Sequence, residues 1–284
     1  MTTRGRNTEV VTSAANPRVR AALALRERRG RSETGRLLVD GSREVLRALE
    51  AGLAVREAFV ADGARSPDAV SIVARLAELG VPQVAVAGSA WSRLAYGERG
   101  SEIVAIVDAP PTDLARLETI LAARADPLLI VVEDAEKPGN LGAIARSADG
   151  AGATALLVAV HEGPPADPWN PNAVRASLGT VFSLPIAIAP SRTLRAWLRE
   201  RAIRVVAARV QAATDYRDAD LRGPLAIVVG SEAAGLGEEW PADEVEGVRL
   251  PMLGRADSLN VSAAAAILLY EARRQRDRGG PAEP

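Results

Sequence analysis

Residues 128–146 have the sequence LLIVVEDAEKPGNLGAIAR, in which an apolar run is followed by a turn and then by a helical pattern. The run 128–133 is short, continuous and rich in Leu, Ile and Val, as expected of a strand that is buried on both faces. Pro138 and Gly139 predict the turn, and Asn140 is placed to cap a helix over 140–151. This stretch therefore predicts one strand–turn–helix unit of an α/β domain.

The same alternation continues toward the C-terminus. Further apolar runs predict strands, and the segments between them predict helices. The predicted strands are 155–159, 184–188, 205–208, 225–229 and 248–250, and the predicted helices are 171–178, 191–201, a short one near 235–239, and 258–276. Strands of this composition are typical of a parallel sheet with helices on both of its faces.

The chain before residue 108 shows a second, smaller α/β alternation. A basic helix over 17–31 precedes it, and a strand over 103–107 ends it. Adjacent prolines follow at 110 and 111, where neither a helix nor a sheet can continue. The predicted organisation is a first domain over 1–108, a linker over 109–126, a second domain over 127–276 and a disordered tail over 277–284.

The composition excludes several kinds of chemistry. The 284 residues include no Cys and one His, so a thiolate nucleophile, a disulfide framework, an iron–sulfur cluster and a multi-histidine metal site are all ruled out, and we expect no metal. His161 lies outside the conspicuous turns, which favours a surface or RNA-contact residue over a catalytic base. No apolar run is long enough to span a bilayer, and the N-terminus lacks a signal-peptide pattern, so a cytoplasmic location is expected.

Positive charge is concentrated near the N-terminus, although the net charge of the chain is −1. Residues 1–56 contain twelve Arg against six Asp or Glu, a balance of +6 that leaves −7 for the remainder. A genomic bias would explain why Arg replaces Lys but not why the arginines cluster. The cluster predicts a polyanion-binding end. Its candidate RNA contacts are Arg18, Arg20, Arg26, Arg28, Arg29 and Arg36.

Two more turns follow predicted strands in the second half. GSEAAGL at 230–236 places glycines where backbone amides can approach a ligand, and Ser258, before the final helix, is a possible cap for it. The chain has no GxGxxG motif after a strand of this half and no GxxxxGK[ST] motif, so dinucleotide and P-loop sites are not indicated. Taken alone, the turns at 138–140 and 230–236 favour an ordinary strand–helix connection over a ligand site. The run Ala263–Ala266 is also compatible with a helix or subunit contact.

Taken together, three segments resemble the three signature motifs of the SpoU/TrmH family of RNA ribose 2′-O-methyltransferases. They are GNLGAIAR at 139–146, GSEAAGL at 230–236, and LPM with SLNVS within 250–262, and they occur in the family's order and spacing. The likeness covers about 127–276. Residues 11–41 resemble the start of the RNA substrate-binding domain that many members carry. The layout is most similar to the subgroup of the thiostrepton- and avilamycin-resistance rRNA methyltransferases and their housekeeping relatives.

The resemblance implies a C-terminal trefoil-knotted SPOUT methyltransferase domain and an N-terminal ribosomal-protein-like α/β RNA-binding domain. It also implies S-adenosylmethionine as the cofactor, a homodimer, and RNA as the substrate, with 23S rRNA expected ahead of tRNA. Glu102 departs from the small residue that relatives often have at this place, which puts local RNA contacts in question.

By position, the resemblance assigns roles to particular residues. The implied catalytic residues are Asn140, Arg146, Glu232, Ser258 and Asn260. The implied cofactor-binding residues are Gly230, Glu232, Gly235, Leu236, Leu250, Met252, Ser258, Leu259 and Asn260, and the implied RNA contacts add Arg146 and Arg175 to the N-terminal arginines. Because a guanidinium is a poor base, Arg146 is expected to hold an RNA phosphate and stabilise the developing alkoxide.

Other functions remain open at this point. The enzyme could act on tRNA instead of 23S rRNA, and its role could be housekeeping modification or antibiotic resistance. A catalytically silent RNA-binding ribosome assembly factor would keep the fold, but it would not need Asn140, Arg146 and Asn260. A small-molecule α/β enzyme would leave the basic N-terminal helix unexplained.

Overall fold

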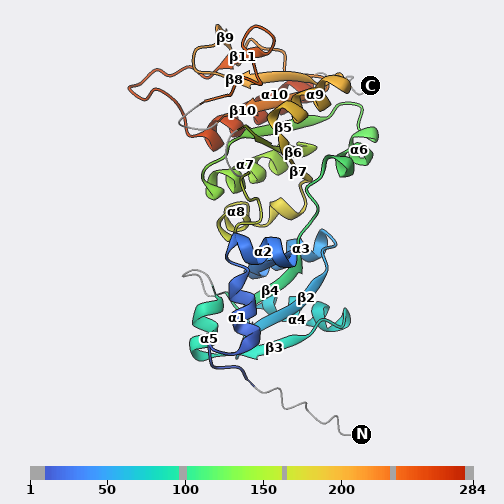
Figure 1. The fold of residues 1–284 in the computed structure, drawn as a ribbon, viewed down its shortest axis with the longest axis vertical. Coiled ribbons are helices and arrows are strands. Elements are labelled where there is room, and N and C mark those ends of the chain that lie inside the picture. Colours follow the sequence, from blue (N-terminus) through green and yellow to red (C-terminus); the bar gives the residue numbers. More distant parts are fainter. Residues whose placement is uncertain (1–9, 96–100, 162–164, 231–234, 279–284) are drawn as a thin grey trace. The chain divides into compact units, whose positions relative to one another are not determined.

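The computed structural model describes residues 10–95, 101–161, 165–230 and 235–278 (Figure 1). The chain forms two compact units. The first combines Met1–Pro110 with Trp169–Ser183, and the second combines Pro111–Pro168 with Leu184–Pro284. The predicted second domain, 127–276, therefore contains a segment that packs with the first unit.

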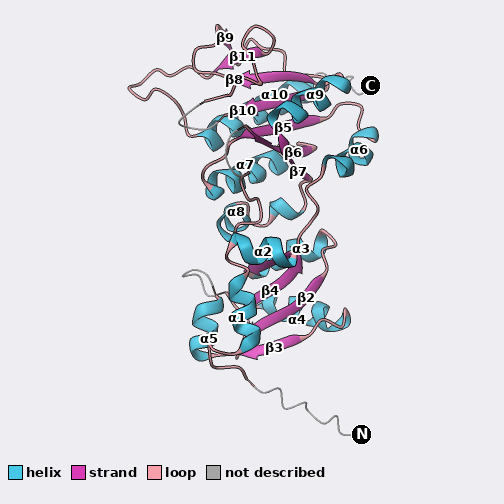
Figure 2. Cartoon of the chain, in the orientation of Figure 1, coloured by secondary structure: helices cyan, strands magenta, loops and turns pink. Residues whose placement is uncertain are grey.

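The described part of the first unit contains a mixed four-stranded sheet with the order β1-β4-β2-β3 (Figure 2). Strand β4 runs antiparallel to both β1 and β2, whereas β2 and β3 are parallel. The elements are α1 (Pro17–Ala24), α2 (Arg28–Thr34), β1 (Arg36–Asp40), α3 (Ser42–Glu50), β2 (Val55–Ala61), α4 (Pro67–Glu78), β3 (Gln83–Val86), α5 (Gly88–Leu94), β4 (Ile103–Asp108), α8 (Pro171–Ala176) and the 3-10 turn Thr180–Phe182.

Helices α1 and α5 pack together on one face of this sheet, where they bury Val19, Leu94 and the ring of Phe59. The single helix predicted over 17–31 is wrong, because the chain turns after α1 and starts again as α2. Helices α1 and α2 approach so closely that a Cβ at Gly30 of α2 would lie 2.2 Å from the carbonyl oxygen of Ala24, the last residue of α1. Only glycine fits at that crossing.

The second unit contains a seven-stranded sheet, among the described residues, with the order β7-β6-β5-β10-β8-β11-β9. Every neighbouring pair is parallel, which confirms the predicted parallel sheet. The elements are α6 (Leu114–Ala122), β5 (Leu128–Glu133), α7 (Pro138–Gly150), β6 (Ala155–Val160), β7 (Ile186–Pro190), α9 (Ser191–Glu200), β8 (Arg204–Ala208), β9 (Thr214–Asp215), β10 (Leu225–Val229), β11 (Glu246–Arg249) and α10 (Val261–Arg278).

Helices cover both faces of this sheet. Residues of α6 and α9, including Leu117 and Trp197, pack on one face against alternate strand residues such as Leu129 and Val131. Helices α7 and α10 contact each other and lie against β6 and β10. No helix in the described ranges is both long enough and apolar enough to cross a membrane.

Two predicted helices of this unit differ from the structure. The short helix near 235–239 is absent, because residues 235–240 form an irregular turn. The carboxylate of Glu133, at the end of β5, accepts a hydrogen bond from the backbone N–H of Gly237, and this bond holds the turn in a non-helical form. The final helix begins at Val261 rather than at 258.

Glu102 has a structural role in the first unit. Its carboxylate accepts hydrogen bonds from the backbone N–H groups of Arg65 (3.1 Å) and Ser66 (2.8 Å), immediately before α4. Hydrogen bonding by Ser66, and then by the backbone of Arg65, lowers the pKa of Glu102 below its ordinary value of 4.5. A group whose pKa falls on folding stabilises the fold above the unfolded-state pKa, and this contribution disappears as the pH falls through the folded-state pKa.

We therefore expect Glu102→Gln to destabilise the first unit at pH 7 by less than about 1 kcal/mol, because the site is solvated. The deficit should shrink as the pH falls below the ordinary pKa of about 4.5, and it should vanish below the lowered pKa of folded wild-type Glu102, where the carboxyl is protonated in both states. Urea unfolding of the wild type and the variant, at pH 7 and below about pH 4.5, measures this difference in the free energy of unfolding. Glu78→Gln, on α4 and without a described partner, is the control, and an equal pH dependence in both variants would contradict the assignment.

Candidate functional site

The turn after β5 differs in detail from the prediction. Helix α7 begins at Pro138 with Lys137 before it, so Asn140 lies inside the first turn and does not cap the helix. Proline suits this first position because its missing N–H has no partner there in any case. The Asn140 side chain is directed instead to another element, since its Oδ1 accepts a hydrogen bond from Nδ2 of Asn260 at 3.3 Å.

Asn260 also caps the final helix, which was predicted of Ser258. Its Oδ1 accepts hydrogen bonds from the backbone N–H of Ser262 (3.0 Å) and from the Ser262 hydroxyl (2.5 Å), and its carbonyl oxygen accepts from the N–H of Ala264. One side chain therefore satisfies the start of α10 and reaches the first motif 120 residues away. The first and third predicted motifs are joined directly.

The second motif meets the other two at the end of β10. A Cβ at Gly230 would lie 2.1 Å from the carbonyl oxygen of Gly235, so the chain folds back on itself here in a way that only glycine permits. A small hollow beside it is lined by Lys137 and Asn140 of the first segment, Gly230 of the second and Val261 of the third. Residues of three distant segments are thereby brought together. Glu232 lies outside the described residues.

A pocket of about 1070 Å³ opens beside these turns, within the second unit. Seven of the nine predicted cofactor-binding residues line it: Gly230, Gly235, Leu236, Leu250, Met252, Ser258 and Leu259. Asn260 lies next to the last of these but is outside the lining. Most of the remaining wall comes from 208–214 and 242–248, which the sequence analysis did not single out. Position along the chain could have indicated 208–214, because this segment follows the carboxyl end of β8 and ligands of parallel sheets bind at the carboxyl ends of strands.

Arg146 projects from α7 into solvent. Neighbouring positions Leu141, Ile144 and Ala145 are buried and fix the helix against the sheet, whereas the Arg146 side chain is exposed. No hydrogen bond or ion pair involves this guanidinium among the residues that the structure describes. It does not line the large pocket, so the site has a cavity and, separately, an uncompensated cation one turn and a half along α7 from Asn140.

Glu133 is a buried carboxylate that the sequence analysis did not recognise. It ends β5 and is 1% exposed. Its Oε1 accepts hydrogen bonds from the Ser191 hydroxyl (2.6 Å) and from the indole N–H of Trp240 (2.7 Å), and its Oε2 accepts from the backbone N–H of Gly237 (2.6 Å). Three donors satisfy the charge. Gly237 follows the pocket residue Leu236, so Glu133 connects strand β5 to the pocket wall.

His161 lies on the surface beside the same turn. Its backbone N–H donates to Oδ1 of Asp134 at 3.0 Å, and its ring packs against Gly237, where a Cβ would approach the ring to 2.9 Å. The exposed position agrees with the predicted surface residue. The described residues contain no group of three or more His, Asp or Glu arranged to hold a metal ion.

Several of the N-terminal arginines predicted to contact RNA have partners within the first unit. Arg18 pairs with Glu57, and Arg29 pairs with Glu33 at 2.7 Å. Arg26 donates to the carbonyl oxygens of Arg93 and Leu94 at the end of α5. These contacts show that part of the basic segment stabilises its own domain. Arg28 and Arg36 are exposed.

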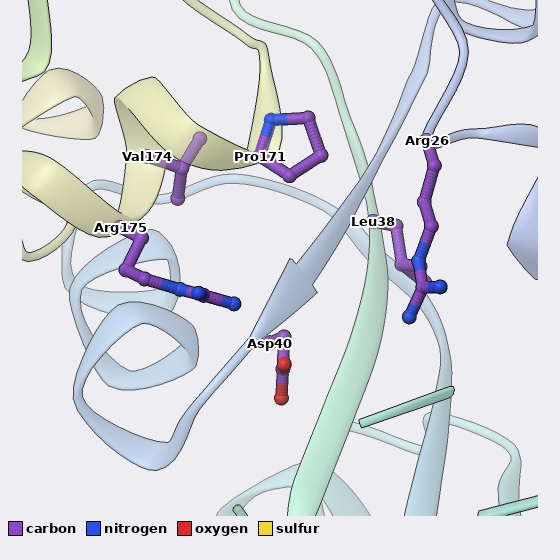
Figure 3. A pocket seen from close by; sticks show the side chains of 6 residues that line it. All are labelled: Arg26, Leu38, Asp40, Pro171, Val174 and Arg175. Atoms are coloured by element: carbon purple, nitrogen blue, oxygen red, sulfur yellow. The ribbon is translucent and has the colours of Figure 1, made fainter. Parts of the chain in front are cut away.

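Arg175 lies on α8 and lines a hollow of the first unit together with Arg26 and Asp40. Figure 3 shows its side chain extending toward the strand that carries Leu38 and Asp40. Arg47 fixes the neighbouring turn, since its guanidinium donates to the carbonyl oxygen of Leu178 at 2.6 Å. Arg175 thus belongs to the first unit.

Comparisons with known proteins agree with this arrangement. Residues 127–270 match the SpoU rRNA methylase family, and residues 16–105 match the MRM3-like substrate binding domain. The chain is 36% identical over 90% of its length, and 88% of the relative, to the 23S rRNA (uridine(2479)-2′-O)-methyltransferase of Streptomyces viridochromogenes. It is 29% identical to the 23S rRNA (guanosine(2553)-2′-O)-methyltransferase RlmP of Bacillus subtilis, over 93% of this chain and 98% of that one.

A solved structure also matches over nearly the whole chain. The SpoU methyltransferase AviRb from Streptomyces viridochromogenes, in complex with the cofactor AdoMet, has a TM-score of 0.82 and 34% identity, and the match covers 93% of this chain and 100% of that one. The family match spans the sheet, the large pocket and all three motif segments that meet beside it. The chain belongs to the SpoU rRNA methylase family.

Proposed function

We propose that the protein transfers a methyl group from S-adenosylmethionine to a ribose 2′-hydroxyl of 23S rRNA. The observation that carries this proposal is the pocket of the second unit, in which residues of the second and third motifs form one wall. The first motif is tied to that wall by the Asn140–Asn260 hydrogen bond. The relatives that are named 23S rRNA 2′-O-methyltransferases support the same substrate class.

The pocket residues fit S-adenosylmethionine. The pocket volume of about 1070 Å³ exceeds the volume that one molecule of S-adenosylmethionine needs. The side chains of Leu236, Leu250 and Met252 offer an apolar surface for an adenine ring, and the fold-back at Gly230 exposes backbone groups to a polar ligand. The bound cofactor would supply a methyl group already activated on a positively charged sulfur.

The chain's own residues then have to position and activate the ribose. The Arg146 guanidinium would hold an RNA phosphate and stabilise negative charge on the 2′-oxygen, while that phosphate accepts the hydroxyl proton. Asn140 and Ser258 would orient the ribose or Arg146, and Asn260 would hold the third loop against the cofactor. Glu232 would fix the second loop.

The assembly proposed for this activity is a cytoplasmic homodimer whose catalytic unit contains the family's trefoil knot. Large apolar side chains of the third-motif loop and α10 are exposed in the single chain, including Leu253 (99%) and Tyr270 (53%). A second copy of the chain would cover such side chains. The first predicted domain, 1–108, would bind RNA, and the second predicted domain, 127–276, would carry the catalytic site.

The test is transfer of tritium-labelled methyl groups from S-adenosylmethionine to total RNA from cells that lack the gene. We expect label in 23S rRNA, at one nucleotide whose 2′-O-methyl group makes the adjacent phosphodiester bond resistant to alkaline hydrolysis. RNA from cells that carry the gene should accept no label at that nucleotide. Label in tRNA alone would contradict the rRNA assignment, and RNA binding without any transfer would show a silent assembly factor.

A further inference from the structure

A groove of about 580 Å³ lies on the first unit, beside α1 and α5. It is lined by Ser13, Ala14, Ala15, Arg20, Leu23, Ser89 and Arg93. The two arginines come from different helices, α1 and α5, which contact each other (Figure 1). The described lining contains two positive charges, two hydroxyl groups and no acidic residue.

The wall of this groove is held by backbone hydrogen bonds. The N–H of Val11 donates to the carbonyl oxygen of Ala85 (2.9 Å), and the N–H of Ala87 donates to that of Val11 (3.0 Å), so residue 11 extends the edge of the sheet at β3. The Ser89 hydroxyl donates to the carbonyl oxygen of Thr12 at 3.0 Å. The segment that leads into the groove is therefore fixed before any ligand binds.

The arginines of the groove differ from their neighbours in charge compensation. Arg18 and Arg29 are paired with carboxylates, and Arg26 is committed to the carbonyl oxygens that end α5. The side chains of Arg20 and Arg93 are exposed, and neither forms a hydrogen bond or ion pair with any described residue. By holding the Arg93 carbonyl, Arg26 also helps to position the start of that free side chain.

We propose, on the basis of the function proposed above, that this groove binds the phosphate backbone of the substrate RNA through Arg20 and Arg93. Arginine donates two parallel hydrogen bonds to a phosphate, and two arginines on adjacent helices can hold neighbouring phosphates of one strand. The Ser13 hydroxyl can donate to a phosphate or ribose oxygen, and the Ser89 oxygen, whose proton is used on Thr12, can accept from a ribose hydroxyl. Two uncompensated cations in a concave surface attract a polyanion, and the acidic partners that would neutralise them elsewhere are lacking in the described lining.

The experiment uses two double variants. The groove variant carries both Arg20→Gln and Arg93→Gln, and the matched control carries both Arg65→Gln and Arg75→Gln. Arg65 and Arg75 are exposed, have no described side-chain partner, and lie before and on α4, which is outside the core cluster of α1 and α5. Both variants lose two positive charges from the same unit. Affinity for purified 23S rRNA from cells that lack the gene is measured from about 50 to about 200 mM KCl.

The groove variant is expected to bind this RNA about tenfold more weakly at ~0.1 M salt. The plot of log affinity against log salt should become less steep, with the magnitude of its negative slope reduced by about 2. The loss should appear mainly as a higher KM for the RNA. The control should stay within about twofold in affinity. Replacing both groove arginines with lysine keeps the charge and should restore most of the affinity.

Equal affinity and salt slope in the groove variant and the wild type would overturn the proposal, as would an equal loss in the control. Both of those outcomes leave methyl transfer by the wild type intact, so they do not affect the proposed function. If the wild type itself transfers no methyl group, the proposed function fails, while the salt slopes still report whether the groove binds RNA.

Discussion

Replacing Arg146 with alanine is expected to reduce methyl transfer to rRNA by at least about a hundredfold while leaving S-adenosylmethionine binding unchanged. Removing one group that stabilises charge in a transition state typically costs about 100- to 1000-fold in kcat. Arg146 is outside the lining of the large pocket, so the cofactor should bind the variant normally. Transfer is measured with tritium-labelled cofactor, and binding is measured by calorimetry.

The fold should tolerate this substitution. Helix α7 is held through Leu141, Ile144 and Ala148, which are fully buried, whereas the Arg146 side chain makes no described contact that folding requires. Arg199→Ala is the matched control, because Arg199 is also exposed, lies on helix α9 of the same unit, and has no described side-chain partner. We expect wild-type turnover in that control.

The lysine variant separates charge from geometry. Arg146→Lys keeps a cation but cannot form two parallel hydrogen bonds to one phosphate, so intermediate activity is expected. Wild-type turnover in Arg146→Ala would remove Arg146 from the mechanism. A loss of cofactor affinity equal to the loss of turnover would instead assign Arg146 to the cofactor site.

The strands of the second unit could be predicted because their sequences are determined by burial. LLIVVE at 128–133 becomes β5, and every residue of it is buried. A strand that is covered on both faces needs apolar side chains at consecutive positions, and this constraint is visible locally. The fold class follows from such runs.

Partnerships between distant segments could not be predicted in this way. The Asn140–Asn260 bond depends on β5 and β10 being neighbours in the sheet, and strand order is not encoded in local composition. The likeness of three motifs to one family indicated that they meet, but the local pattern before the final helix assigned the cap of α10 to Ser258. The structure assigns it to Asn260, because the helix starts three residues later than the pattern indicated.

Counting charges along the chain overestimated the number of free cations. Arg18 is compensated by Glu57, which is 39 residues away, and Arg26 is used within the domain. Conversely, Arg93 lies outside the basic cluster and carries no local signal, yet it faces the same groove as Arg20. The charge available on a surface therefore depends on which arginines are paired in the fold and which ones face the same groove, and a count along the sequence shows neither.

Replacing Glu133 is expected to have the largest effect on stability. In Glu133→Leu, the Ser191 hydroxyl, the Trp240 indole and the Gly237 N–H all lose their acceptor inside the second unit. Unsatisfied buried donors cost about 1–3 kcal/mol each, partly offset because no carboxylate has to be desolvated. We expect a loss of about 3 kcal/mol in the free energy of unfolding, measured by urea denaturation with tryptophan fluorescence.

Glu133→Gln separates stability from the shape of the pocket. The amide oxygen still accepts from Ser191 and Trp240, but the amide nitrogen now meets the Gly237 N–H, and two donors cannot bond to each other. The turn that follows Gly235 and Leu236 should therefore move, and we expect about tenfold weaker S-adenosylmethionine binding. The free energy of unfolding should fall by about 1.5 kcal/mol.

Ser191→Ala is the control that decides between the two roles. It removes one donor to the same carboxylate, from the start of α9 and away from the pocket lining, at a cost of about 1 kcal/mol. Its cofactor affinity should equal that of the wild type, because the bond to Gly237 remains. If Glu133→Gln also bound the cofactor normally, Glu133 would only stabilise the fold. Weaker cofactor binding in the glutamine variant alone would identify the carboxylate as the group that positions the pocket wall.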